Sequence, residues 1–81
     1  MQVTVKLFAV ARQVAGVEQL TLELPTGATV ADLRQALAET SPELAPLLPS
    51  MAVAIDAEYV DDAAPVRADA EIACIPPVSG G

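Results

Sequence analysis

The residues with the clearest chemical potential are the last six of the sequence, namely Pro76, Pro77, Val78, Ser79, Gly80 and Gly81. The two prolines stiffen the backbone in an extended form and direct it away from a preceding strand. Glycine lacks a Cβ atom, so the end of this segment is slim. A slim tail can enter a narrow channel in another protein and present its terminal carboxylate to chemistry there. The alternative is an inert, frayed terminus, and so short a motif does not by itself decide between the two.

The rest of the sequence excludes several kinds of catalytic site. Its 81 residues include no histidine, which rules out a Ser-His-Asp triad, a Cys-His pair and an imidazole zinc site. The single cysteine, Cys74, cannot form an internal disulfide, and its apolar neighbours predict a buried small hydrophobe rather than a persulfide carrier. Asp56, Glu58, Asp61 and Asp62 lack the glycine and ligand spacing of a calcium loop. We therefore expect no metal site.

Charge and hydropathy limit the partners. The formal net charge of -7 argues against nucleic acid, whose phosphates require a basic surface, and favours a protein partner with basic groups. The longest apolar-rich stretch, 44–55, is interrupted by prolines and is too short for a bilayer core of about 30 Å. No signal-peptide pattern opens the sequence. We therefore expect a soluble, cytoplasmic protein. A hydrophobic fraction of 53% argues against disorder, so we expect one folded domain.

The elements that must position the tail can be predicted from hydrophobic periodicity. Apolar residues alternate over 2–7 and 19–24, which predicts two strands of a hairpin joined through a short helical turn at 9–16. Further strands are expected over 52–55, 59–60 and 71–75. In this alternation Phe8 and Ile75 fall on the outward side, whereas Ile72 and Cys74 fall inward.

Helical signals lie between these strands. Thr29 and Asp32 form a capping box before apolar residues at helical spacing, which predicts a helix over 30–40. A second, short helix is expected to begin at Ser41-Pro42. The order predicts an α+β domain over 1–75 with a mixed sheet, one crossover helix and a short second helix, followed by a tail over 76–81. A β-grasp, ubiquitin-like fold requires this order, although other small α+β folds are compatible with it.

The residues in this order also resemble a known family. The stretch 72–81, IACIPPVSGG, looks like the end of the small, sulfur-carrying subunits of molybdopterin synthase, the MoaD type. Leu7-Phe8-Ala9 with Arg12 resembles that family's first strand and loop, and 52–56 resembles its third strand. Two positions depart from the family pattern. Asp56 stands where asparagine is usual, and Asp69 takes a glycine's place in a turn, where we expect a left-handed backbone with some strain.

The resemblance implies a covalent sulfur carrier that is not an enzyme on its own. An E1-like adenylyltransferase would use ATP to adenylate the carboxylate of Gly81, and a sulfurtransferase would convert it to a thiocarboxylate. The tail would then enter the active site of a large subunit and give its sulfur to a cyclic pyranopterin precursor, forming a dithiolene. No tightly bound cofactor is implied, and the expected assembly with the large subunit is a heterotetramer.

Docking on such partners requires a surface. Phe8, Tyr59 and Ile75 are the candidates, because exposed apolar residues that cluster mark interaction sites and aromatic residues are typical anchors. If a bulge shifts the alternation, Phe8 and Ile75 belong to the core instead. The resemblance adds Arg12 as a partner contact, together with Pro76, Pro77, Val78 and Ser79, and places Gly80 beside the reactive Gly81.

Three other functions remain compatible with the sequence. One is a sulfur carrier for thiamine or another thio-metabolite. Another is a ubiquitin-like modifier joined to lysines, which would share the activation step and end in an isopeptide bond. The last is a plain protein-binding module with an inert tail.

Overall fold

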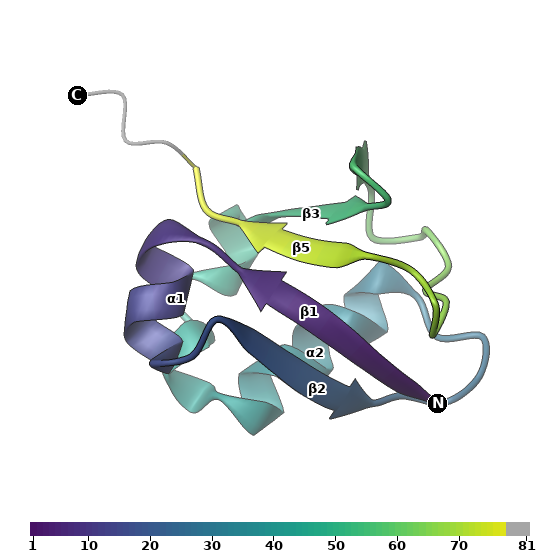
Figure 1. Ribbon diagram of the computed structural model, residues 1–81, viewed down its shortest axis with the longest axis horizontal. Helices are drawn as coiled ribbons and strands as arrows, with labels where there is room; N and C mark the ends of the chain where they lie inside the picture. Colours follow the sequence, from purple (N-terminus) through teal and green to yellow (C-terminus); the bar gives the residue numbers. More distant parts are fainter. Residues whose placement is uncertain (78–81) are drawn as a thin grey trace.

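The alternating apolar residues build a single five-stranded sheet in the computed structural model, which describes residues 1–77. The strands are β1 (Gln2–Leu7), β2 (Gln19–Glu23), β3 (Ala52–Ile55), β4 (Glu58–Val60) and β5 (Ile72–Ile75). Their order across the sheet is β2-β1-β5-β3-β4. β1 and β5 are parallel, and the other neighbouring pairs are antiparallel. The first and last strands of the chain therefore lie side by side at the centre of the sheet (Figure 1).

The crossover helix, α2 (Val30–Thr40), has the predicted limits and the predicted cap. The Asp32 backbone N–H donates to Thr29 Oγ1 over 3.4 Å, and the Thr29 N–H donates to Asp32 Oδ2 over 2.9 Å. These two bonds satisfy backbone donors that would otherwise have no partner at the start of a helix. The capping box thus sets the point at which the chain leaves the sheet edge and crosses over one face.

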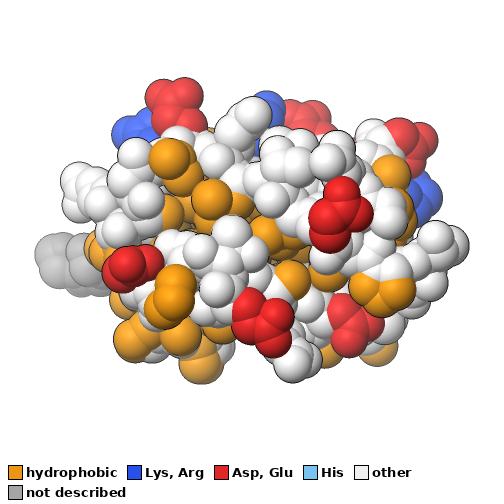
Figure 2. Space-filling model, turned by 90° about the horizontal axis from the view of Figure 1, so that it is seen from below, with side chains coloured by type: hydrophobic (Ala, Val, Ile, Leu, Met, Phe, Trp, Pro, Cys, Tyr) orange, Lys and Arg blue, Asp and Glu red, His pale blue; other side chains and the backbone are white. Residues whose placement is uncertain are grey.

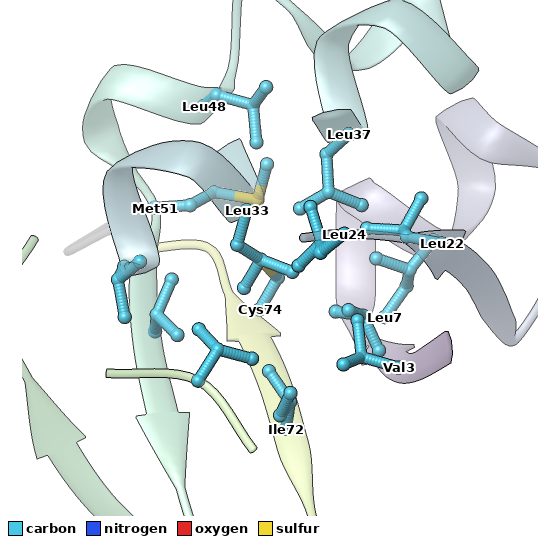
Figure 3. Packing of buried hydrophobic residues seen from close by; sticks show 14 of the residues in the cluster. Val3, Leu7, Leu22, Leu24, Leu33, Leu37, Leu48, Met51, Ile72 and Cys74 are labelled. Atoms are coloured by element: carbon cyan, nitrogen blue, oxygen red, sulfur yellow. The ribbon is translucent and has the colours of Figure 1, made fainter. Parts of the chain in front are cut away.

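The core lies between α2 and the sheet. Leu33 and Leu37 of α2 are fully buried and face the inward side chains of β1 and β5, among them Leu7, Ile72 and Cys74 (Figure 3). Full burial of a leucine or isoleucine side chain contributes about 1.5–3 kcal/mol relative to exposure. The inward residues of β1 and β5 are nearly inaccessible, as the alternation predicted, so this packing holds the central strand pair against the helix.

Two short segments connect these elements. α1 (Ala9–Ala15) joins β1 to β2 as a true helix and ends at Gly16, where φ is 77° and the N–H donates to the Arg12 carbonyl over 2.9 Å. Glycine suits this position because it adopts the left-handed region without a Cβ clash. The short helix expected from Ser41 is a 3₁₀ helix, Pro42–Leu44, followed by another over Leu48–Ser50. The prolines at 46 and 49 lack the N–H that a longer helix requires.

The turn between β3 and β4 carries one of the departures from the family pattern. Asp56 and Ala57 have φ values of 51° and 69°, as a two-residue hairpin turn of type I′ requires. Asp56 Oδ1 accepts from the Glu71 N–H over 3.0 Å, a bond that an asparagine oxygen could also make. Its second oxygen, Oδ2, accepts from Arg67 Nη2 over 2.6 Å. Aspartate therefore adds an ion pair to the link between this turn and the start of β5.

The expectation for Asp69 was wrong. Among residues 1–77, the non-glycine residues with positive φ are Ala9, Asp56 and Ala57, so Asp69 is not left-handed. The Ala70 N–H donates to the Arg67 carbonyl over 3.2 Å and closes an ordinary β-turn, whose central positions accept most residue types. The turn needs no glycine and holds no strain at this residue.

Stability should depend on pH through Asp56. The Glu71 N–H and the Arg67 guanidinium favour the ionised carboxyl and lower its pKa below the ordinary 3.8. Since the folded-state pKa is the lower one, the stabilisation is complete well above pH 3.8 and is lost as the pH falls through the folded-state value. We expect wild type to unfold at higher urea than Asp56→Asn at pH 7, with the difference disappearing in acid.

Urea titrations followed by circular dichroism between pH 7 and pH 3 measure this difference. Glu39→Gln, on the exposed side of α2, removes the same charge and is the control. A gap between wild type and Asp56→Asn that stayed constant over this range would show that the ion pair contributes nothing.

Candidate functional site

The root of the tail is fixed at the centre of the sheet. β5 lies between β1 and β3, and the inward-outward alternation of its side chains continues into Pro76, which is buried, and Pro77, which is exposed. The chain leaves β5 at the same edge of the sheet where β1 ends and α1 begins (Figure 1). The predicted tail residues Val78, Ser79, Gly80 and Gly81 lie outside the described residues. The structure shows only the point at which they begin, after Pro77.

The outer face of the sheet carries a hollow whose floor is made by small residues. In the register, Lys6 of β1 pairs with Ala73 of β5, Ala73 with Ala54 of β3, and Ala54 with Tyr59 of β4. Two alanines thus lie between two long side chains, which leaves a depression of about 280 Å³. Neither alanine was singled out in the sequence, although the outward position of Ala73 was predictable from the alternation in β5.

Phe8, Tyr59 and Ile75 all line this hollow, which we call the sheet hollow; its other lining residues are Lys6, Ala54, Ala57, Glu71 and Ala73. Phe8 is 45% exposed and Tyr59 is 71% exposed, so both aromatic residues of the chain lie on the surface. Tyr59 and Ile75 also line a second depression with Pro76 and Pro77. The three predicted docking residues therefore surround one apolar surface that continues to the root of the tail.

The cations of the chain have distinct surroundings. Lys6 Nζ donates to Glu71 Oε1 over 2.9 Å at the polar end of the sheet hollow. Arg12 lies on the other side of Phe8, in a neighbouring depression, where Nη1 is 4.0 Å from Glu18 Oε1. Arg12 and Lys6 therefore both flank Phe8. Neither pair was found from the sequence, because the partners come from different elements.

Arg34 makes its contacts within the fold. Its Nε donates to Asp62 Oδ1 over 2.8 Å and its Nη1 donates to the Leu48 carbonyl over 2.6 Å. The side chain is 20% exposed and ties α2 to the loop after β4 and to the 3₁₀ helix before β3. Arg34 thus holds the helix layer together, on the side of the sheet opposite the hollow.

Cys74 is buried in the core, in agreement with its inward position. Its side chain is inaccessible, and burial raises the pKa of its thiol to about 11, with a small opposing effect of the Arg34 charge. A thiol attacks or carries sulfur as the thiolate, which is scarce at neutral pH for such a group. This cysteine packs as a small apolar side chain.

Most charged side chains of the chain are acidic. In the view of Figure 2, acidic side chains are spread between apolar ones over this side of the molecule, with basic side chains near the margin. This distribution matches the formal charge of -7. Within residues 1–77, no helix is long and apolar enough to cross a membrane.

Comparisons with known proteins agree on the family and the fold. The sequence profile of the ThiS family matches residues 5–81. The molybdopterin synthase sulfur carrier subunits of Arabidopsis thaliana and Chlamydomonas reinhardtii are 38% and 39% identical to the whole chain, which covers 84% and 100% of their lengths. The crystal structure of small archaeal modifier protein 1 from Haloferax volcanii matches with a TM-score of 0.89 at 29% identity, over all of both chains. The fold is the β-grasp that the element order predicted.

The burial of Cys74 predicts its reactivity. At pH 8 the thiol should not react with Ellman's reagent in the native protein, because it is inaccessible and its pKa lies near 11. In denaturing urea it should react at once and completely, as measured by absorbance. Rapid reaction of the folded protein would mean that the central strands open readily.

Proposed function

The chain belongs to the ThiS family, and we propose that it is the sulfur carrier subunit of a molybdopterin synthase. The observation that carries this proposal is the identity of 38% and 39% to two subunits of that name over the whole chain. The Pro-Pro exit and the Gly-Gly end of the sequence support it, since a carrier must hold a reactive group at a distance from its own domain.

The reacting group in this proposal is the carboxylate of Gly81. A carboxylate is a poor electrophile, so it first attacks the α-phosphorus of ATP on an adenylyltransferase and releases pyrophosphate. The acyl-adenylate has a good leaving group, and sulfur delivered by a sulfurtransferase displaces AMP from it. The thiocarboxylate that results carries an exposed, nucleophilic sulfur. In the large subunit this sulfur forms a bond to a carbon of the pyranopterin precursor, and water cleaves its bond to the acyl carbon of Gly81, which restores the carboxylate. Two such transfers complete the dithiolene.

The domain itself supplies position and docking. The chain contains no histidine and its cysteine is buried, so we expect the partner to supply the acid and base groups. The sheet hollow with Phe8, Tyr59 and Ile75 offers an apolar surface next to the root of the tail. We propose that the large subunit covers this surface while residues 76–81 reach its active site, and that Arg12 makes a polar contact at the margin.

The formal net charge of -7 favours partners with basic groups. Charges of opposite sign steer association, and salt screens this effect over about 10 Å at 0.1 M. Association with the large subunit should therefore slow as salt is raised, while the apolar contact at the sheet hollow keeps the dissociation rate nearly constant.

Another function has a specific observation in its favour. The likeness to small archaeal modifier protein 1 over all of both chains favours a ubiquitin-like modifier that is joined to lysines of other proteins. A carrier for thiamine or another thio-metabolite is also compatible with membership of the ThiS family. A modifier and a carrier share the activation of Gly81 and differ in the acceptor of its acyl group.

The intact mass of the protein isolated from its own cells separates these functions. A carrier should show a fraction of molecules in which one oxygen is replaced by one sulfur at Gly81, whereas a modifier should show covalent adducts with other proteins. Removing Gly81 should abolish sulfur transfer in a reconstituted synthase reaction and leave circular dichroism unchanged. A truncated chain that still transferred sulfur would refute the carrier proposal.

The docking surface is tested by Phe8→Asp. Phe8 occupies the N-cap position of α1, where aspartate is favourable, so the variant should fold normally. Loss of a central aromatic anchor should weaken binding to the large subunit by about 30-fold or more, measured by calorimetry. Val17→Asp, at a site of similar exposure outside the sheet hollow, is the matched control. Equal effects of the two substitutions, or unfolding of Phe8→Asp, would contradict the proposal.

A further inference from the structure

An activated acyl group at Gly81 reacts most readily with accessible amines, thiols and imidazoles, including those of the chain that carries it. This consideration rests on the proposed function, in which Gly81 becomes an acyl-adenylate. The sequence is unusually poor in such groups: it contains one lysine, Lys6, one cysteine and no histidine. The structure shows which of these groups are accessible to an acyl group.

The fold makes two of the possible nucleophiles unavailable for reaction, by burial or by hydrogen bonding. Cys74 is inaccessible within the core and its thiol stays protonated at neutral pH. The N-terminal ammonium of Met1 donates to the Leu24 carbonyl over 2.7 Å and lies 3.9 Å from Glu23 Oε2. The side chain of Met1 is 15% exposed, so this amine is held at the edge of the sheet.

Lys6 is different, because its side chain is half exposed. It lies on β1 opposite Ala73, two residues before the end of the strand that carries the tail. Its Nζ donates to Glu71 Oε1 over 2.9 Å at the polar end of the sheet hollow. Before this nitrogen can attack an acyl carbon, it has to leave the hydrogen bond and lose a proton.

We propose that Lys6 is the one site at which an activated Gly81 acylates this chain, and that Glu71 keeps the reaction slow. In the reaction the lone pair of Lys6 Nζ attacks the acyl carbon and forms an amide bond. The bond from that carbon to AMP, or to a thiol in a thioester, breaks, and the nitrogen proton passes to solvent. No oxidant or reductant is needed. A partner that covers the sheet hollow also covers Lys6 and so protects the activated tail.

A thioester at Gly81 tests this without any partner enzyme. The full chain is made as an intein fusion and released with 2-mercaptoethanesulfonate, which leaves a defined thioester at Gly81. During incubation at pH 8, intact mass separates hydrolysis from amide formation, and peptide mapping locates the amide. We expect the amide at Lys6, in an internal ring or a linked pair of chains, and its loss in Lys6→Arg, which keeps the charge.

Glu71→Gln should raise the rate of amide formation about two- to fivefold, the range expected for release of one exposed ion pair. Glu58→Gln removes the same charge from β4 outside the sheet hollow and is the matched control. Equal rates in these two variants, an amide at Met1, an ester at Tyr59, or hydrolysis alone would overturn the proposal. Because the thioester is made chemically, these outcomes are independent of whether cells load Gly81 with sulfur, which the intact-mass measurement decides.

Discussion

The parallel pairing of β1 with β5 is the contact on which the rest of this structure depends. It joins the beginning of the chain to its end, and two parallel strands cannot be joined by a tight turn. The chain therefore has to pass through β2, α2 and β3 before β5 can add to the sheet. The register of this pair decides at once which side chains face α2 and which face outward. It also sets the point from which the tail departs.

The two faces of the sheet have different surroundings. The inner face is covered by α2, and their packing stabilises the domain. A domain this small buries little apolar surface, so its stability depends on this packing. Over residues 1–77, both α-helices and both 3₁₀ helices lie away from the outer face, where alanines at adjacent register positions leave a hollow between longer side chains (Figure 1). The same strand, β5, thus contributes Ile72 and Cys74 to the core and Ala73 and Ile75 to the surface beside the tail.

Much of this arrangement was predictable because it depends on the local spacing of apolar residues. The start of α2 followed from Thr29 and Asp32, the limits of β1 from alternation and those of β3 from a short apolar run. β4 and β5 each begin one residue away from the predicted start. The adjacency of the first and last strands belongs to the β-grasp fold, which the element order indicated. By contrast, the sheet hollow depends on which residues become neighbours across strands, and the pairs Lys6–Glu71 and Arg67–Asp56 join distant segments. For Asp69 the family pattern was misleading, because the turn closes with ordinary backbone angles.

The central position of β5 also has a mechanical consequence. A partner that draws on the tail applies force along the axis of β5, and the start of β1 lies at the opposite end of a parallel neighbour. Hydrogen bonds on both sides of β5 then bear the load together in shear, rather than breaking one after another as at an unzipping edge. A strand held in this way resists extraction from the sheet. The domain is therefore built to withstand a pull on the segment that follows β5.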